Sequence, residues 1–270
     1  MFRRIKNKRL RYAIIGLYFI VIFFCALELN FLWLFGYSPT IKDIKTPNIN
    51  VVSELYTSDG KLIGKYYKEN RTPVEYDSIS PAIIDALVAT EDVRFYKHSG
   101  IDIRSLLSSI VSTASGDKRG ASTITQQLAK NLYSTRNRKS QGLIKYIPLV
   151  RTVVFKLKEW VTAYKLENYY SKNEILTLYL NTVPFGGTIY GINVAAQTFY
   201  GKKPASLNIA EAALLVGMLK GPSLYNPVNH PERALNRRNT VLSQMVKYNY
   251  LTETAYQKLS RTSLRLRYNP

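Results

Sequence analysis

The stretch that decides the fold reads Glu91-Asp92-Val93-Arg94-Phe95-Tyr96-Lys97-His98-Ser99-Gly100. It follows residues 81–90, where small and apolar side chains recur at helical spacing, and Ser80 and Pro81 suit the first positions of that helix. The helix end therefore presents two adjacent carboxylates, backed by two aromatic side chains and one of the two histidines of the chain. These ten residues alone leave two interpretations open: a solvated acidic pair, or a carboxylate placed for proton transfer.

The N-terminus has the composition of a membrane anchor. Residues 1–11 carry six basic side chains and no acidic one, and residues 12–36 are almost entirely apolar. A helix needs about 20 apolar residues to cross a bilayer, and basic flanking residues stay in the cytoplasm. A cleaved signal peptide fits less well, because its apolar core is shorter and a small-residue cleavage site follows it. The sequence predicts a single-pass protein of the cytoplasmic membrane, with a cytoplasmic N-terminus and its body on the outer face.

The chain is strongly basic, with a formal net charge of +20 from 38 basic and 18 acidic residues. Without the six basic residues of the tail, 32 basic residues still face 18 acidic ones. Such an excess favours an anionic partner, of which nucleic acid is the usual one. Nucleic acid is scarce outside the membrane and the chain has no motif for it, so anionic headgroups or a phosphorylated lipid fit better. The single cysteine, Cys25, excludes an intramolecular disulfide.

Beyond the anchor, residues 37–75 are predicted to form a linker with a β-hairpin, because Asp59-Gly60 separates two β-rich runs. Apolar residues then recur at helical spacing over 83–87, 103–114, 153–170, 173–180, 209–219 and 232–248. The body, residues 76–252, is therefore predicted to be mainly α, without a βαβ rhythm or an internal repeat. Residues 253–270 are interpreted as the start of a C-terminal connection.

A second unusual stretch, GASTITQQLAKN, occupies residues 120–131. Seven of its last ten side chains can form hydrogen bonds. The stretch is either a capped helix with exposed glutamines or a surface for sugar hydroxyls and amides, with Lys130 as an added cation. The neighbouring residues 133–150 mix basic and apolar side chains, which suits both a membrane surface and a solvated loop.

A third cluster begins at residue 151. Arg151, Lys156 and Lys158 precede Glu159, and residues three or four apart can share a helix face. The cluster is either a surface ion pair, which contributes about 0–1 kcal/mol to stability, or it places a second carboxylate of the active site among phosphate-binding cations.

Together these stretches resemble the family 51 peptidoglycan glycosyltransferases. The stretch at 91–100 resembles the first motif of the family, GASTITQQ at 120–127 the second, and KLKE at 156–159 the third. KNEILTLYLN at 172–181 and RRNTVL at 237–242 are similar to the fourth and fifth. All five occur in the family's order, and the resemblance covers about residues 53–252. Three positions depart from the pattern: Ala121 replaces a glycine, Phe155 an arginine that would contact phosphate, and Thr177 a glutamate thought to be structural.

The resemblance implies a lysozyme-like helical head with a small mobile jaw, about residues 118–150, against the membrane. It implies an enzyme that polymerises lipid II by a single inverting displacement, forming β-1,4 linkages. The nascent lipid-linked glycan is then the donor, and undecaprenyl pyrophosphate is the leaving group.

The resemblance also assigns roles to particular residues. Glu91 is expected to be the catalytic base, and Glu159 a second catalytic carboxylate that orients cations or holds a metal. Substrate contacts are expected from Asp92, Ser122, Thr123, Gln126, Gln127, Lys130, Arg151, Lys156 and Lys158. Structural parts are expected for Phe95, His98, Gly100, Asn181, Arg237 and Arg238. No cofactor is required, and a divalent cation, Mg²⁺ or Mn²⁺, is considered at Glu159 beside the pyrophosphate.

Two other functions stay open on the sequence. A lytic transglycosylase or lysozyme-type hydrolase also uses a glutamate on a related fold, but it has no need of the cations around Glu159. A non-enzymatic cell-wall scaffold has no need of the two carboxylates. The sequence also leaves open whether a transpeptidase domain follows, as in class A penicillin-binding proteins. The Ser-x-x-Lys patterns at Ser58 and Ser115 lack the companion elements of such a domain.

Overall fold

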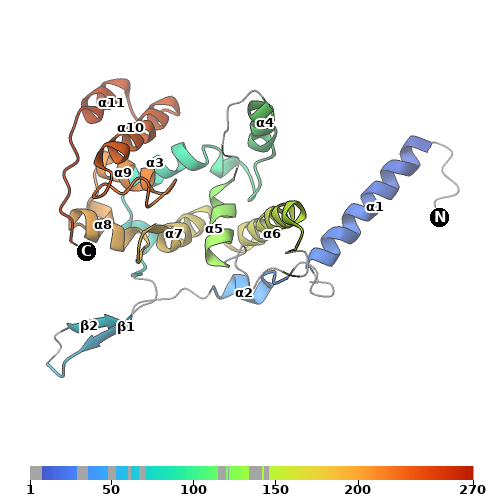
Figure 1. The fold of residues 1–270 in the computed structure, drawn as a ribbon, viewed down its shortest axis with the longest axis horizontal. Coiled ribbons are helices and arrows are strands. Elements are labelled where there is room, and N and C mark those ends of the chain that lie inside the picture. Colours follow the sequence, from blue (N-terminus) through green and yellow to red (C-terminus); the bar gives the residue numbers. More distant parts are fainter. Residues whose placement is uncertain are drawn as a thin grey trace.

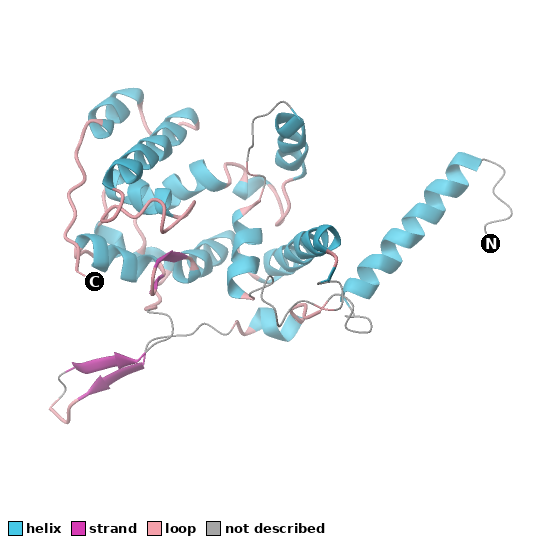
Figure 2. Cartoon of the chain, in the orientation of Figure 1, coloured by secondary structure: helices cyan, strands magenta, loops and turns pink. Residues whose placement is uncertain are grey.

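The computed structural model describes residues 8–28, 36–47, 53–59, 62–66, 71–114, 120, 122–133, 142 and 146–269. Helices dominate this part of the chain (Figures 1 and 2), which confirms the mainly α prediction. The helices are α1 (Lys8–Glu28), α2 (Ile41–Lys45), α3 (Pro81–Glu91), α4 (Ile103–Ala114), α5 (Ile124–Leu132), α6 (Pro148–Tyr169), α7 (Lys172–Thr182), α8 (Ile192–Tyr200), α9 (Ile209–Met218), α10 (Pro231–Lys247) and α11 (Glu253–Ser260).

Local signals in the sequence set several of these helix ends. Ser171 with Glu174, and Asn208 with Glu211, form reciprocal capping boxes at the starts of α7 and α9. Proline occupies the first position of α3, α6 and α10, where its missing N–H costs no hydrogen bond. Ser80 precedes α3 as expected, but its hydroxyl donates to the carbonyl of Leu207 at 3.0 Å and does not cap the helix.

The core forms where α3 packs against α9 and α10, and where α5 packs against α6 and α7. Figure 1 shows α5 between α7 and α6, with the end of α3 above it. The α3 segment contributes a nearly continuous apolar surface, since six of its eleven residues are buried. This packing fixes the direction of α3 and therefore the position of its last residue, Glu91.

The predicted linker, residues 37–75, contains the expected hairpin and one helix that was not expected. The hairpin is confirmed: β1 (Ser53–Tyr56) pairs antiparallel with β2 (Leu62–Tyr66). The polar segment before it contains α2, which begins with a capping box between Thr40 and Asp43 and buries Ile44 completely. The Thr-x-x-Asp pattern could have predicted this short helix, because it satisfies two backbone amides at once.

The C-terminal residues also belong to the head. After α11 the chain returns along α8, where the amides of Arg267 and Asn269 donate to the carbonyls of Phe199 and Thr198 at 2.9 and 2.8 Å. Leu264 and Leu266 pack against the main core. Within the described part, this segment therefore packs on the head, and its role as the start of a C-terminal connection stays a prediction.

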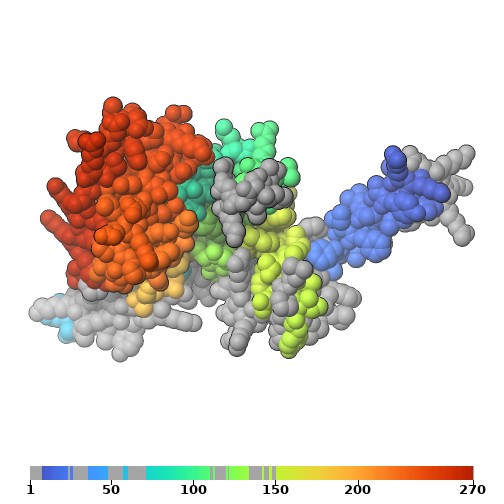
Figure 3. All heavy atoms as spheres, turned by 45° about the horizontal axis from the view of Figure 1, so that its top comes forward, coloured from blue at the N-terminus to red at the C-terminus, as the bar shows by residue number. Residues whose placement is uncertain are grey.

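The structure describes only part of the N-terminal region for which an anchor was predicted. Helix α1 spans 21 residues and stands away from the body in Figures 1 and 3. Within the described residues, no helix is both long and apolar enough to cross a membrane, so the anchor stays a prediction. Residues 1–7 of the basic tail lie outside the described residues, as do residues 118–119, 121, 134–141 and 143–145 of the predicted jaw.

Candidate active site

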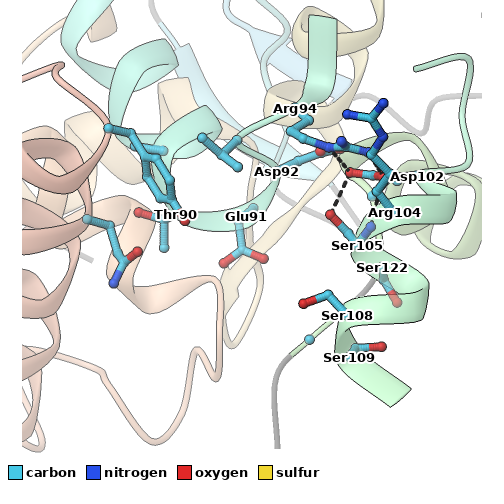
Figure 4. A pocket seen from close by; sticks show the side chains of 16 residues that line it. Thr90, Glu91, Asp92, Arg94, Asp102, Arg104, Ser105, Ser108, Ser109 and Ser122 are labelled. Atoms are coloured by element: carbon cyan, nitrogen blue, oxygen red, sulfur yellow. Dashed lines mark hydrogen bonds and ion pairs between the residues drawn. The ribbon is translucent and has the colours of Figure 1, made fainter. Parts of the chain in front are cut away.

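Glu91 is the last residue of α3 and points into a cavity of about 360 Å³ (Figure 4). Helix α4 forms one wall of this cavity through Ser105, Ser108 and Ser109, and α10 contributes Gln244 and Tyr248. The cavity thus combines the Glu91 carboxylate with hydroxyl, amide and aromatic groups, and its lining also includes Asp92, Asp102, Arg94 and Arg104. Such a lining suits a polar ligand better than a purely apolar one.

The carboxylate of Glu91 is held from two sides. Gln127 Nε2, from α5, donates to Glu91 Oε2 at 2.9 Å, and the Tyr179 hydroxyl, from α7, donates to Gln127 Oε1 at 3.0 Å. A guanidinium nitrogen of Arg237, from α10, lies 4.0 Å from Glu91 Oε1. Arg237 was expected to have a structural role, and the structure places it beside Glu91.

Asp92 faces the opposite way from Glu91. Its two oxygens lie 3.0 Å from His98 Nε2, and one of them accepts the backbone amide of Ile124 at 3.0 Å. This carboxylate therefore joins the turn after α3 to the start of α5, and His98 is structural as predicted. A substrate contact by Asp92 would compete with these partners, so the structure favours a structural role for it.

Gly100 closes the same turn in a conformation that favours glycine. Its φ is +83°, and an added Cβ would lie 2.9 Å from the backbone carbonyl of Ala163 in α6. Its own carbonyl accepts hydrogen bonds from Thr123 Oγ1 at 2.7 Å and from Gln126 Nε2 at 3.1 Å. Thr123 also caps α5. These buried side chains were predicted to contact substrate, and the structure commits them to the scaffold. Gly100 is structural as predicted.

A second cavity, of about 170 Å³, holds two of the predicted cations, Lys130 and Lys156, and the second glutamate, Glu159. Lys156 Nζ lies 2.9 Å from Glu159 Oε2 and donates to Ser122 Oγ at 2.6 Å. Lys130 lines the same cavity with Gln126 and Gln127.

The two cavities meet at shared residues. Ser122 lines both of them, and Gln127 lines the second cavity while it bonds to Glu91. The cavities of Glu91 and Glu159 therefore adjoin each other, and the two adjoining cavities are together called the groove.

Lys158 does not belong to this groove. Its side chain is fully buried, and its Nζ donates to the carbonyl of Tyr37 at 2.7 Å, in the segment that leads to α2. Residues two apart on a helix face different directions, so Lys156 and Lys158 separate. The prediction that Lys158 contacts substrate is wrong. Arg151 lies in the first turn of α6 and lines neither cavity, so its substrate role stays a prediction.

Replacing Lys158 with methionine should reveal this burial through the pH dependence of stability. Burial lowers the pKa of Lys158 from 10.5 to about 8, so between these pH values the folded protein binds fewer protons than the unfolded chain. Its free energy of unfolding therefore rises with pH across that window. The free energy of unfolding of the wild type minus that of Lys158→Met should increase by about 1–3 kcal/mol from pH 8 to pH 10.5. Urea unfolding at a series of pH values measures it, and a pH-independent difference would contradict the assignment.

The acidic groups near the turn are neutralised by protein partners. Arg94 Nε donates to Asp102 Oδ2 at 2.8 Å, and a second guanidinium nitrogen reaches Oδ1. Burial alone would raise the pKa of the Asp102 carboxyl, but hydrogen bonds from Arg94 and Ser105 outweigh it and hold the pKa well below its usual range. Asp102, Asp92 and His98 have ligand atoms within 4.8 Å of one another. Because Arg94, Ser105 and Ile124 already occupy these carboxylates, the cluster does not fit a metal ion.

The residues around Glu159 also fit a divalent cation poorly. Among the described residues, Glu159 belongs to no group of three or more metal-ligating side chains. Its carboxylate faces the ammonium group of Lys156, which already supplies positive charge. Mg²⁺ favours sites with several carboxylate and other oxygen ligands, and Glu159 supplies the one carboxylate among the residues that line this cavity.

The remaining motif residues stabilise the head. Asn181 exchanges two hydrogen bonds with the backbone of Val74, at 2.9 and 3.0 Å. Phe95 is fully buried. Arg238 is buried as well and donates to the carbonyls of Leu259, Ser260 and Thr262, which ties α10 to the segment after α11. All three match their predicted structural parts.

Two of the three departures from the motifs are accommodated locally, and the third, Ala121, lies outside the described residues. Phe155 is buried in α6 and does not line either cavity. Thr177 donates its hydroxyl to the carbonyl of Asn173 at 2.8 Å, one turn earlier in α7. Helix α7 continues unbroken through this position, so the replacement does not disturb its course.

The chain belongs to the transglycosylase family, family 51 of the glycosyltransferases, because residues 59–246 match the family model described as Transglycosylase. Penicillin-binding protein 1A of Escherichia coli is 36% identical over 233 residues, which cover 86% of this chain and 26% of that protein. Penicillin-binding protein 1A of Aquifex aeolicus is 42% identical over 208 residues, covering 76% and 27%. A crystal structure of penicillin-binding protein 1A from Haemophilus influenzae aligns with a TM-score of 0.44 at 23% identity, covering 83% of this chain and 22% of that one. The chain spans about a quarter of the length of the curated relatives quoted above.

Proposed function

We propose that this protein is a peptidoglycan glycosyltransferase that polymerises lipid II into β-1,4-linked glycan during bacterial cell-wall synthesis. One observation carries the proposal: the cavity of Glu91 adjoins the cation cavity of Lys156, Lys130 and Glu159 at Ser122, and Gln127 of the second cavity donates a hydrogen bond to Glu91. A sugar hydroxyl can thus be activated at one end of the groove while a departing anion is neutralised at the other.

The reaction follows from these two ends. Glu91 takes the proton from the 4-hydroxyl of the N-acetylglucosamine on the incoming lipid II. The resulting oxygen bonds to the anomeric carbon of the donor as the bond to pyrophosphate breaks, which inverts that centre. Undecaprenyl pyrophosphate leaves with the electron pair, and the positive charge of Lys156 stabilises it. Glu159 orients Lys156 through their 2.9 Å ion pair. The proposal contains no metal-dependent step, because the residues around Glu159 already provide a cation.

Membrane association is part of the same proposal. Large apolar side chains of α1 are exposed along its length, among them Leu17, Phe19 and Ile22. Phe23 and Ala26 of α1 pack beside Val154 of α6, and the start of α6 exposes Ile147, Val150 and Val153. An apolar surface shared by two helices suits a bilayer, where the polyprenyl chain of lipid II also resides. In this proposal α1 anchors the protein once, with a cytoplasmic N-terminus and the head outside.

The proposal is tested with two substrates offered to the same purified protein. Fluorescent lipid II in vesicles should yield long glycan, with release of undecaprenyl pyrophosphate. Purified sacculi should release no soluble fragments. The cations of the groove suit a reaction that releases pyrophosphate, and cleavage of a finished glycan strand releases none. Cleavage of sacculi without any polymerisation would instead identify a lytic or lysozyme-type enzyme. Binding to sacculi without either reaction would identify a scaffold.

A further inference from the structure

A chain of hydrogen bonds runs from the core to the carboxylate of Glu91. The Tyr179 hydroxyl donates to Gln127 Oε1 at 3.0 Å, and Gln127 Nε2 donates to Glu91 Oε2 at 2.9 Å. Tyr179 lies within α7 and is among the largest fully buried side chains of the described residues. A side chain so deeply buried cannot touch a substrate, so any effect on the reaction must pass through Gln127.

The direction of donation along this chain is determined by charge. An ionised carboxylate only accepts hydrogen bonds, so Gln127 must present its NH₂ group to Glu91 and its oxygen to Tyr179. The reverse orientation would place two acceptor oxygens, of Gln127 and Glu91, against each other. Burial, and secondly the negative charge of Glu91, raise the pKa of Tyr179 well above 10.0, so its hydroxyl keeps the proton that it donates.

We propose that Tyr179 is a positioning residue for the base, which locks the Gln127 amide so that it donates to Glu91 Oε2 and leaves Oε1 to receive the substrate proton. The inference rests on the proposed role of Glu91. Oε1 is the oxygen on the side of Arg237, whose guanidinium lies 4.0 Å away, too far for a direct hydrogen bond. The base is thus fixed through one oxygen while the other stays available.

Tyr179→Phe is the direct test, because phenylalanine keeps the buried ring and removes only the hydroxyl. Without it, the Gln127 amide can rotate, and the ionised carboxylate loses its aligned donor. We expect kcat for lipid II polymerisation to fall by about three- to tenfold, with KM changed by less than about twofold. The acidic limb of the kcat–pH profile should move to higher pH, because the ionised form of the base is less well stabilised. Unchanged kcat and an unchanged profile would overturn the inference.

Two further variants separate positioning from a general loss of stability. In a Gln127→Ala background, adding Tyr179→Phe should have no further effect on kcat, because the intermediary is gone. Additive losses would overturn the inference. Tyr170→Phe is the matched control, since it removes another tyrosine hydroxyl, which donates to the carbonyl of Ile44 at 2.8 Å away from the groove. It should leave kcat and the pH profile unchanged.

A titration that needs no activity distinguishes this inference from the proposed function. The ¹³C signal of the Glu91 carboxyl can be followed by NMR in the full chain in detergent, and the signal is identified by its absence in Glu91→Gln. Its titration midpoint should move to higher pH in Tyr179→Phe. If wild-type protein polymerises no lipid II, the proposed function fails, while this shift still supports the hydrogen-bond chain. Normal polymerisation with an unmoved midpoint would reject the positioning role alone.

Discussion

Replacing Glu91 with glutamine is expected to reduce lipid II polymerisation by about 10²–10⁴-fold, the range that a positioned general base contributes. Glutamine has the same shape, and its oxygen can still accept from Gln127 Nε2, which now donates to Glu91 at 2.9 Å. It cannot take a proton from the attacking hydroxyl. The rate of glycan formation at saturating lipid II measures the effect.

The interpretation of that result depends on the fold being kept. Circular dichroism and thermal unfolding of Glu91→Gln should match wild type, since the core under α3 is unchanged. Glu75→Gln is the matched control, because Glu75 is exposed and forms no side-chain cap at the helical turn that it precedes. It should polymerise normally. Activity of Glu91→Gln within about threefold of wild type would refute the base assignment, because a general base contributes far more.

Replacing Lys156 with alanine is expected to lower kcat/KM for lipid II by about 10²-fold, because a charge-assisted contact to the departing pyrophosphate is lost. The change also leaves the carboxylate of Glu159 without the ammonium group 2.9 Å away. Lys156→Arg should recover part of the activity, since it restores the charge with a different shape. Initial rates over a range of lipid II concentrations, with the amount of released undecaprenyl pyrophosphate, measure both variants.

Lys202→Ala provides the matched control for Lys156→Ala. Lys202 forms a comparable ion pair with Glu211 at 2.7 Å. The side chain of Lys202 is 39% exposed and that of Lys156 is 35% exposed. Lys202 lines neither cavity of the groove. A loss confined to Lys156→Ala would show that the position of the charge matters. Equal kinetics of Lys156→Ala and wild type would mean that this lysine serves stability alone.

Much of the local structure could be read from short sequence patterns. The helical spacing around residues 83–87 and 209–219 predicted α3 and α9, and Asp59-Gly60 predicted the hairpin. Helices α8 and α11 and the short α2 were missed. The cap at α2 was visible in the sequence, whereas α8 is short and follows Gly191 without a side-chain cap, so no capping signal marked its start.

The candidate site was harder to predict, because polar residues near one another in sequence face different partners. Thr123 and Gln126 lie among substrate-like polar residues but turn inward to the carbonyl of Gly100. Arg237 and Arg238 are adjacent, yet one approaches Glu91 while the other is buried beneath the end of α11. A motif shows which residue types occur, but it does not show which way each side chain turns.

By itself, the sequence determined that the chain is mainly helical, that an acidic residue stands at the end of α3, and that a glycine must close the turn behind it. These features depend on periodicity, capping and backbone conformation, which act between near neighbours in the chain. Only the tertiary structure decided that Gln127 and Tyr179 support Glu91, that Lys156 faces the groove, and that Lys158 is buried toward Tyr37. The physical reason is that these contacts join separate helices, and their geometry is fixed by how the core packs.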